Sequence, residues 1–118
     1  MPNHSTTIQR VTEWEIRRLF NEGRFYERGQ SGEFNVVVYK ERPSTIVSEH
    51  IPPGSISQDV RYYDQDNNEI ARVSCFIRPD GTSTLHDPKR LLIGNILYRI
   101  IKGGEATPRP PDYESPSE

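Results

Sequence analysis

The stretch DVRYYDQDNNEIARVSCFIRPDGT, residues 59–82, decides which fold this chain is expected to adopt. Val60 and Tyr62 alternate with polar neighbours, and residues 70–77 alternate again after the polar turn DQDNN. Alternation with a period of two is typical of strands with one buried face, and Asn and Asp tolerate the backbone of tight turns. A Pro-Asp-Gly turn then ends the second strand. The stretch therefore predicts an antiparallel hairpin. Three arginines lie on it or beside it: Arg61, Arg72 and Arg78.

The segment VTEWEIRRLFNEG, residues 11–23, predicts a helix that precedes this hairpin. Thr12 and Glu15 have the spacing of a capping box, and Gly23 suits the left-handed position just past a helix end. The apolar residues at helical spacing are Ile16, Leu19 and Phe20. The two arginines between them are expected to lie on a solvated face.

Residues 24–42 lie between this helix and a proline-rich connection, and predict two strands around a Gly-containing turn. Valines fall on both faces of the second strand, so a central position in the sheet is expected for it. Residues 42–58 contain three prolines and predict a long loop, of a length that is usually functional or mobile.

The segment HDPKRLLIGN, residues 86–95, carries the signals of a short helix near 87–93. Asp87 is a good N-cap and Pro88 fits the first helical position. Residues 96–101 alternate and are rich in β-branched side chains, which favours a last strand. The order of elements predicts an α+β domain over residues 11–102, with the N-terminal helix packed on a mainly antiparallel sheet of about four to five strands.

The two ends of the chain differ in composition from this domain. Residues 1–10 are expected to be flexible, and residues 103–118 form a Pro-rich acidic tail that is expected to be disordered. The net charge of −2 combines a charge of −3 from residue 105 onward with +1 over residues 1–104. The domain therefore lacks the strongly basic balance typical of DNA-binding domains.

The sequence also limits the location and the chemistry of the protein. No run approaches the roughly 18 apolar residues that span a bilayer, and the N-terminus lacks the pattern of a signal peptide, so a cytoplasmic protein is expected. Cys75 is the single cysteine and is expected to be a buried structural thiol. His4, His50 and His86 lack metal-ligand spacing, so neither a metal nor a cofactor is expected.

The expected helix start near residue 88 is the candidate site. Unpaired N–H groups at a helix start attract anions, and Lys89 and Arg90 would add positive charge there. Arg78, Arg72 and Arg61 would complete an anion-binding site, with His86 as a candidate catalytic acid or base beside these cations. The simpler interpretation is that Asp87 only caps the helix and that Lys89 and Arg90 are solvated.

Two segments, YYDQDNNEIARVSCFIRPDGT (residues 62–82) and DPKRLLIGNILY (residues 87–98), resemble a group of small bacterial proteins of uncharacterised activity. These share a Tyr-Asp-x-x-x-Asn hairpin, an RPDGT turn and a DPKRLL segment. A looser likeness, at the level of the fold, is to ribonuclease toxins of the RelE, barnase and colicin type. It implies an N-terminal helix and an antiparallel sheet with scattered basic residues. The chain departs from those toxins because it is not clearly basic and no catalytic set matches theirs.

Two functions are compatible with these observations. The favoured one is a non-enzymatic protein-interaction module, such as an inhibitor, an accessory protein or one half of a homodimer, with aromatic contact anchors. The alternative is a toxin-like, RNA-directed domain, an endoribonuclease in its catalytic form, that binds phosphate near residue 88. The first predicts an exposed apolar patch or a free strand edge, and the second predicts a single positive patch.

Overall fold

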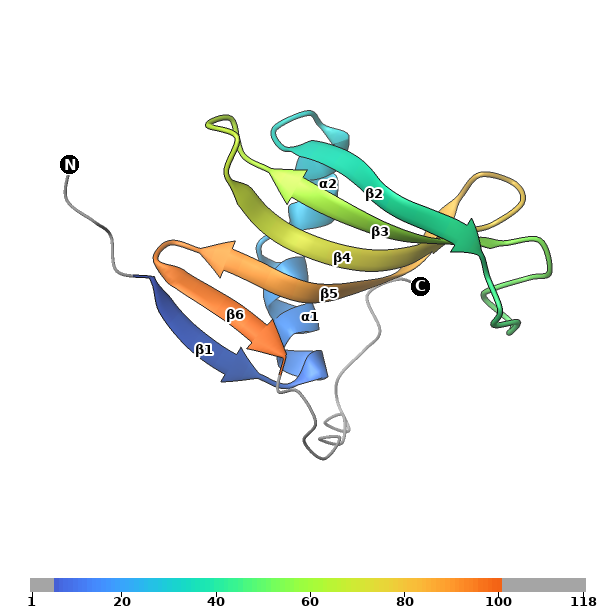
Figure 1. The fold of residues 1–118 in the computed structure, drawn as a ribbon, viewed down its shortest axis with the longest axis horizontal. Helices are drawn as coiled ribbons and strands as arrows, with labels where there is room; N and C mark the ends of the chain where they lie inside the picture. Colours follow the sequence, from blue (N-terminus) through green and yellow to red (C-terminus); the bar gives the residue numbers. More distant parts are fainter. Residues whose placement is uncertain (1–5, 101–118) are drawn as a thin grey trace.

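The computed structural model describes residues 6–100, so the expected tail at 103–118 lies outside the described part of the chain. The elements are β1 (Thr7–Val11), α1 (Glu13–Glu22), α2 (Phe25–Gln30), β2 (Asn35–Pro43), β3 (Ile56–Tyr63), β4 (Glu69–Ile77), β5 (Ser83–Ile93) and β6 (Ile96–Ile100). The six strands form one sheet in the order β1-β6-β5-β4-β3-β2, and both helices lie on one face of it (Figure 1). β1 is parallel to β6, and the other neighbours in this sheet are antiparallel.

The α+β class and the mainly antiparallel sheet are thus confirmed, but the sheet has six strands rather than four to five. Two of the six were not expected as strands: β5, described below, and β1, which begins at Thr7, inside the segment that we expected to be flexible. β1 forms because β6 offers it a parallel partner, with Thr7 opposite Ile96 and Val11 opposite Ile100. This long-range pairing is not visible in the local sequence.

The start of α1 follows the sequence prediction. The Thr12 N–H donates to Glu15 Oε1 at 2.9 Å, and the Glu15 N–H donates to Thr12 Oγ1 at 3.3 Å, so the capping box is confirmed. The end differs, because Gly23 has a φ of −80° and the left-handed residue is Arg24, at a φ of 56°. Gly23 is needed for another reason: a Cβ there would lie 2.6 Å from Cε1 of Phe25.

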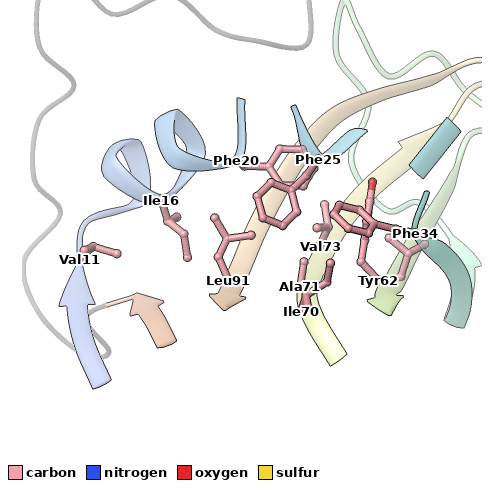
Figure 2. Close-up of a cluster of buried hydrophobic side chains, with 11 residues drawn as sticks. Val11, Ile16, Phe20, Phe25, Phe34, Tyr62, Ile70, Ala71, Val73 and Leu91 are labelled. Carbon is pink, nitrogen blue, oxygen red and sulfur yellow. The ribbon is translucent and has the colours of Figure 1, made fainter. Parts of the chain in front are cut away.

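The hydrophobic core lies between the helices and one face of the sheet (Figure 2). Ile16 and Phe20 of α1 and Leu91 of β5 are almost fully buried. The rings of Phe20 and Phe25 stack at 5.5 Å, and Phe20 meets Tyr62 edge to face at 5.9 Å. Burying each such side chain contributes about 1.5–3 kcal/mol. Core residues therefore mark the face of each strand that lies toward the helices.

The expected strand at the start of residues 24–42 is wrong, because Phe25–Gln30 forms the short helix α2. Phe25 is buried against Phe20, so packing on α1 determines the conformation of this segment. The expected central position of the next strand is also wrong, because β2 is an edge strand. Its valines lie on both faces and remain exposed, although α2 approaches the helix-side face of β2, where a Cβ at Gly29 would lie 2.7 Å from Cγ2 of Val36.

The short helix expected near 87–93 is wrong as well, because these residues belong to β5. Pro88 lies opposite Val73, and the β4–β5 register shifts on both sides of that pair. A proline has no N–H for a regular ladder, and such irregularities are where sheets accommodate it. Pro88 and Leu91 are both buried, so pairing and burial outweigh the local helix-start signal.

Candidate functional site

The helix start that we expected to bind an anion is absent, because Asp87 lies within a strand. Asp87 accepts a hydrogen bond from Arg17 Nη2 at 3.1 Å and another from Lys89 Nζ at 2.8 Å. Arg17 is therefore not on a solvated face, since it connects α1 to β5 and its side chain is only 18% exposed. Asp87 neutralises part of the positive charge that the sequence suggested for this position.

Arg78 does not join the other predicted site residues. Its Nε donates to the carbonyl oxygen of His50 at 3.1 Å, and its Nη1 donates to Thr82 Oγ1 at 3.2 Å. These bonds connect the long loop to the turn after β4. Arg78 therefore has a structural role in the described part of the chain.

His86 lies apart from the arginines, on the side of the sheet that carries α2. Its ring is 4.5 Å from the ring of Tyr26, and its Nε2 is 3.3 Å from Ser83 Oγ. Burial lowers the pKa of His86, although Glu27 opposes this effect. His86 and Tyr26 line a pocket of about 450 Å³ together with Cys75. The catalytic role of His86 stays a prediction, and this pocket does not include the predicted cations.

Cys75 is buried, as the sequence predicted. Burial, together with the nearby Asp59, raises its pKa to about 11. The thiol is therefore protonated at neutral pH, which makes it a poor nucleophile.

Three predicted anion-binding residues do come together. Arg61 is the Cα partner of Arg72 across β3 and β4, and Arg72 is the partner of Arg90 across β4 and β5. The register then adds two arginines that sequence reasoning missed, because Arg90 is paired with Arg99 and Arg99 with Arg10. We call these five residues, in spatial order, the arginine row: Arg61, Arg72, Arg90, Arg99 and Arg10.

The arginine row lies on the sheet face opposite the helices, which we call the open face. Each member adjoins residues of the core in its own strand, and side chains of successive strand residues point to opposite faces. These core neighbours are Val60 and Tyr62, Ala71 and Val73, Leu91, Tyr98 and Ile100, and Val11. Within residues 6–100, neither helix covers the open face (Figure 1).

Glu69 is the carboxylate that partly neutralises the row. It lies 3.5 Å from Arg61 Nη1 and accepts a hydrogen bond from Arg72 Nη2 at 3.2 Å. This interaction raises the pKa of Arg72. Within residues 6–100, Arg10, Arg90 and Arg99 have no carboxylate at salt-bridge distance. Among the described residues, positive charge is therefore left uncompensated toward the β1 end of the row.

Arg90 has like-charged neighbours on both sides of its strand. Its Nε is buried and has no hydrogen-bond partner among the described residues. Burial lowers the pKa of Arg90, the neighbouring Arg72 and Arg99 lower it further, and Glu69 opposes this effect. Arg90 and Arg72 line a pocket of about 300 Å³ on the open face, with Leu92 and Leu97 as apolar walls.

A second pocket of about 300 Å³ lies on the other side of Arg72. Tyr39 forms one wall, and the Arg61 guanidinium carbon lies 3.7 Å from the centre of its ring. Lys89 lines the same pocket, so a further predicted cation lies beside the row, although it is paired with Asp87. The open face thus has two adjacent hollows that share Arg72. One of them contains the Tyr39 ring, and each also contains one carboxylate, Glu69 in the first and Asp59 in the second.

The comparisons with known proteins do not extend this description. No protein-family model matches the chain, and no similar protein was found among curated proteins or among solved structures. Residues 6–100 contain no group of three His, Cys, Asp or Glu side chains arranged to hold a metal ion. In the same residues, no helix has the length and apolar character needed to cross a membrane.

Proposed function

We propose that this protein is a non-enzymatic interaction module whose open face binds a polyanionic partner, and that single-stranded RNA is the class of partner. The observation that carries the proposal is the arginine row, which places five arginines in register on five adjacent strands. Residues 6–100 contain thirteen basic and thirteen acidic residues. The chain therefore gathers positive charge on one face without an overall excess.

The energetics of the row support a bound anion. Like charges directly opposite one another in a sheet are destabilising, by a few tenths to about 1 kcal/mol a pair. The row contains four such neighbouring pairs, and Glu69 compensates only one end. A polyanion on this face would relieve the repulsion, because each guanidinium would gain a phosphate as a charge-assisted hydrogen-bond partner.

The dimensions of the row favour an extended ligand over a single small anion. Neighbouring strands are about 4.8 Å apart, so four steps between strands give a row about 19 Å long. A single strand of nucleic acid that crosses the β-strands can present several phosphates along this length. A duplex is a poorer fit, because reading its grooves requires a protruding helix or ribbon rather than a broad sheet face.

The aromatic side chains of the open face also support RNA. Tyr39 already stacks with Arg61, and Tyr63 lies on the same face because it follows the buried Tyr62 in β3. Sheet faces that bind single-stranded RNA combine aromatic rings for base stacking with cations that follow the backbone.

A non-enzymatic role is supported by where the reactive groups lie. His86 lines a pocket on the helix side of the sheet, across the sheet from the row. Cys75 lines the same pocket and has a raised pKa. An endoribonuclease would need an acid–base group beside the bound phosphates, so binding without cleavage is the better-supported function.

The test is fluorescence anisotropy with a labelled oligouridylate of about 12 nucleotides, titrated at several salt concentrations. Arg99→Gln is expected to weaken binding and to lower the slope of log K against log salt by about 0.7, the share of one phosphate contact. Arg18→Gln is the matched control, because Arg18 is an exposed arginine of α1 that is paired with Glu22. It should leave the slope unchanged.

Four results would overturn the proposal. The first is the absence of binding at about 50 mM salt, where phosphate contacts are strong. The second is an equal effect of Arg99→Gln and Arg18→Gln. The third is cleavage of the oligonucleotide, seen on a denaturing gel and lost in His86→Gln, which would favour the ribonuclease. Tighter binding of polyglutamate than of RNA in the same titration would replace RNA with an acidic protein partner.

A further inference from the structure

The outer edge of β2 exposes unusually apolar residues for a sheet edge. Val36, Val37, Val38 and Tyr39 are 43%, 49%, 49% and 62% exposed, and β2 is the last strand of the sheet. An uncovered edge strand offers unpaired backbone N–H and C=O groups to another strand. Proteins usually protect such edges with charges, prolines or bulges.

In β2 those protective features occupy only the second half of the strand. The register shift lies between Val38 and Lys40, and Lys40, Glu41, Arg42 and Pro43 follow it. The first half, residues 35–38, is regular and carries no charge. The edge is therefore open along one short segment with three valines.

We propose that this segment pairs with the same segment of a second copy of the chain, antiparallel and centred on Val37. The proposal does not depend on RNA binding. In an antiparallel pair of identical strands the two-fold axis is perpendicular to the sheet, so residues opposite one another share a face. With Val37 on the axis, Val37 lies opposite the partner's Val37 and Val36 opposite the partner's Val38.

Charge determines which register is available. If the axis passed through Lys40, Glu41 or Arg42, that residue would face its own copy, and like charges opposite one another are unfavourable. An axis at Glu41 would in addition set Lys40 against the partner's Arg42. Repulsion therefore disfavours a dimer centred on the charged residues 40–42. A dimer centred on Val37 places valines opposite valines and has no such repulsion.

The symmetry also favours a closed dimer over other pairings of copies. A contact between β2 of one copy and β1 of the next would be heterologous and would continue into an open array. A β2–β2 contact uses the same surface of both copies, so it forms a closed dimer and leaves no β2 edge free. Among residues 6–100, β2 offers the longer of the two sheet edges, nine residues against five in β1.

The dimer would have a consequence for the open face if the proposed function is correct. Val37 is the Cα partner of Arg61, the member at the β3 end of the arginine row. The perpendicular axis keeps the open faces of both copies on the same side. A pair centred on Val37 therefore brings the Arg61 ends of two rows together along one line, which doubles the length available to a polyanion.

The experiment measures self-association of the full chain without RNA. Sedimentation velocity of the wild-type protein over a 100-fold concentration range is expected to show a mass that rises from 13.6 kDa toward twice that value. Val37→Lys, which sets two cations on the axis, should remain monomeric. Val47→Lys is the control, because Val47 is 65% exposed in the loop after β2. Urea melts of both variants confirm that they fold.

A cross-linking variant tests the register independently of any fold defect. Val37→Cys should form a disulfide-linked dimer under mild oxidation, because residues on the axis have facing Cβ atoms. Val47→Cys should cross-link more slowly, and the buried Cys75 should not contribute. The proposal is overturned if the wild-type protein stays monomeric throughout, or if the two cysteine variants cross-link at equal rates. If Arg99→Gln loses RNA binding but still dimerises, RNA binding by the open face and dimerisation through β2 are independent properties.

Discussion

Arg90 and Arg99 are Cα partners across β5 and β6, and within residues 6–100 neither has a carboxylate at salt-bridge distance. Two guanidinium groups in such positions repel one another, and the Nε of Arg90 is shielded from water, which weakens the screening there. Sheets usually place opposite charges in such positions. The pair therefore costs stability, and under the proposed function a bound polyanion would relieve this repulsion.

Removing one of these charges should stabilise the protein. Arg99→Thr keeps a side chain that suits a strand and removes a repulsive partner on each side, so we expect unfolding to require about 0.5 kcal/mol more free energy at low salt. Equilibrium urea unfolding measures this value. The gain should shrink as salt rises, because exposed charges are screened. A destabilised Arg99→Thr protein would contradict the repulsion that we infer.

The contact between Arg17 and Asp87 predicts a loss of stability. Asp87→Asn removes the carboxylate that holds Arg17 at 3.1 Å, and both side chains are largely shielded from water. Hydrogen bonds to charged groups contribute about 1.5–3 kcal/mol, so we expect a loss near the lower end of that range.

Urea unfolding of Asp87→Asn, Arg17→Met and the double variant gives the coupling energy between the two residues. Glu22→Gln is the matched control, because Glu22 belongs to an exposed ion pair on the same helix. If the effects of the two single substitutions on the free energy of unfolding are additive, the coupling energy is zero and the contact does not stabilise the protein.

His86 predicts a dependence of stability on pH. Burial lowers its pKa in the folded protein below the ordinary value of about 6.5, so the unfolded chain binds a proton more readily. The contribution of His86 to stability is therefore complete above that ordinary value and is lost as the pH falls from it through the lowered pKa of the folded protein. Urea unfolding at about pH 7.5 and 5.5 should show a decrease, which His86→Gln reduces. A pH dependence in His86→Gln equal to that of the wild-type protein would contradict this account.

The local sequence predicted those parts of the fold that depend on near neighbours. Thr12 and Glu15 form the capping box because their spacing alone fixes the contact. Asp87 and Pro88 carry equally good helix-start signals, yet they belong to a strand because Val73 and Ser74 of β4 pair with them. No local pattern contains that pairing.

The candidate site was predictable only in part for the same reason. Arg61 and Arg72 could be placed together because one hairpin carries both. Arg99 was visible as part of an alternating segment, but its position beside Arg90 depends on the β5–β6 register. Arg10 was missed because β1 exists only through its parallel pairing with β6.

The arginine row is tested most directly by NMR of the arginine side chains during titration with oligouridylate. The account predicts that the Nε–Hε signals of Arg61, Arg72, Arg90 and Arg99 shift together and saturate at one RNA concentration. The signals of Arg17, Arg18 and Arg28, which belong to the helices, should stay in place. Shifts confined to the helix side, or no shift at low salt with RNA in excess, would contradict the claim that the open face is the binding surface.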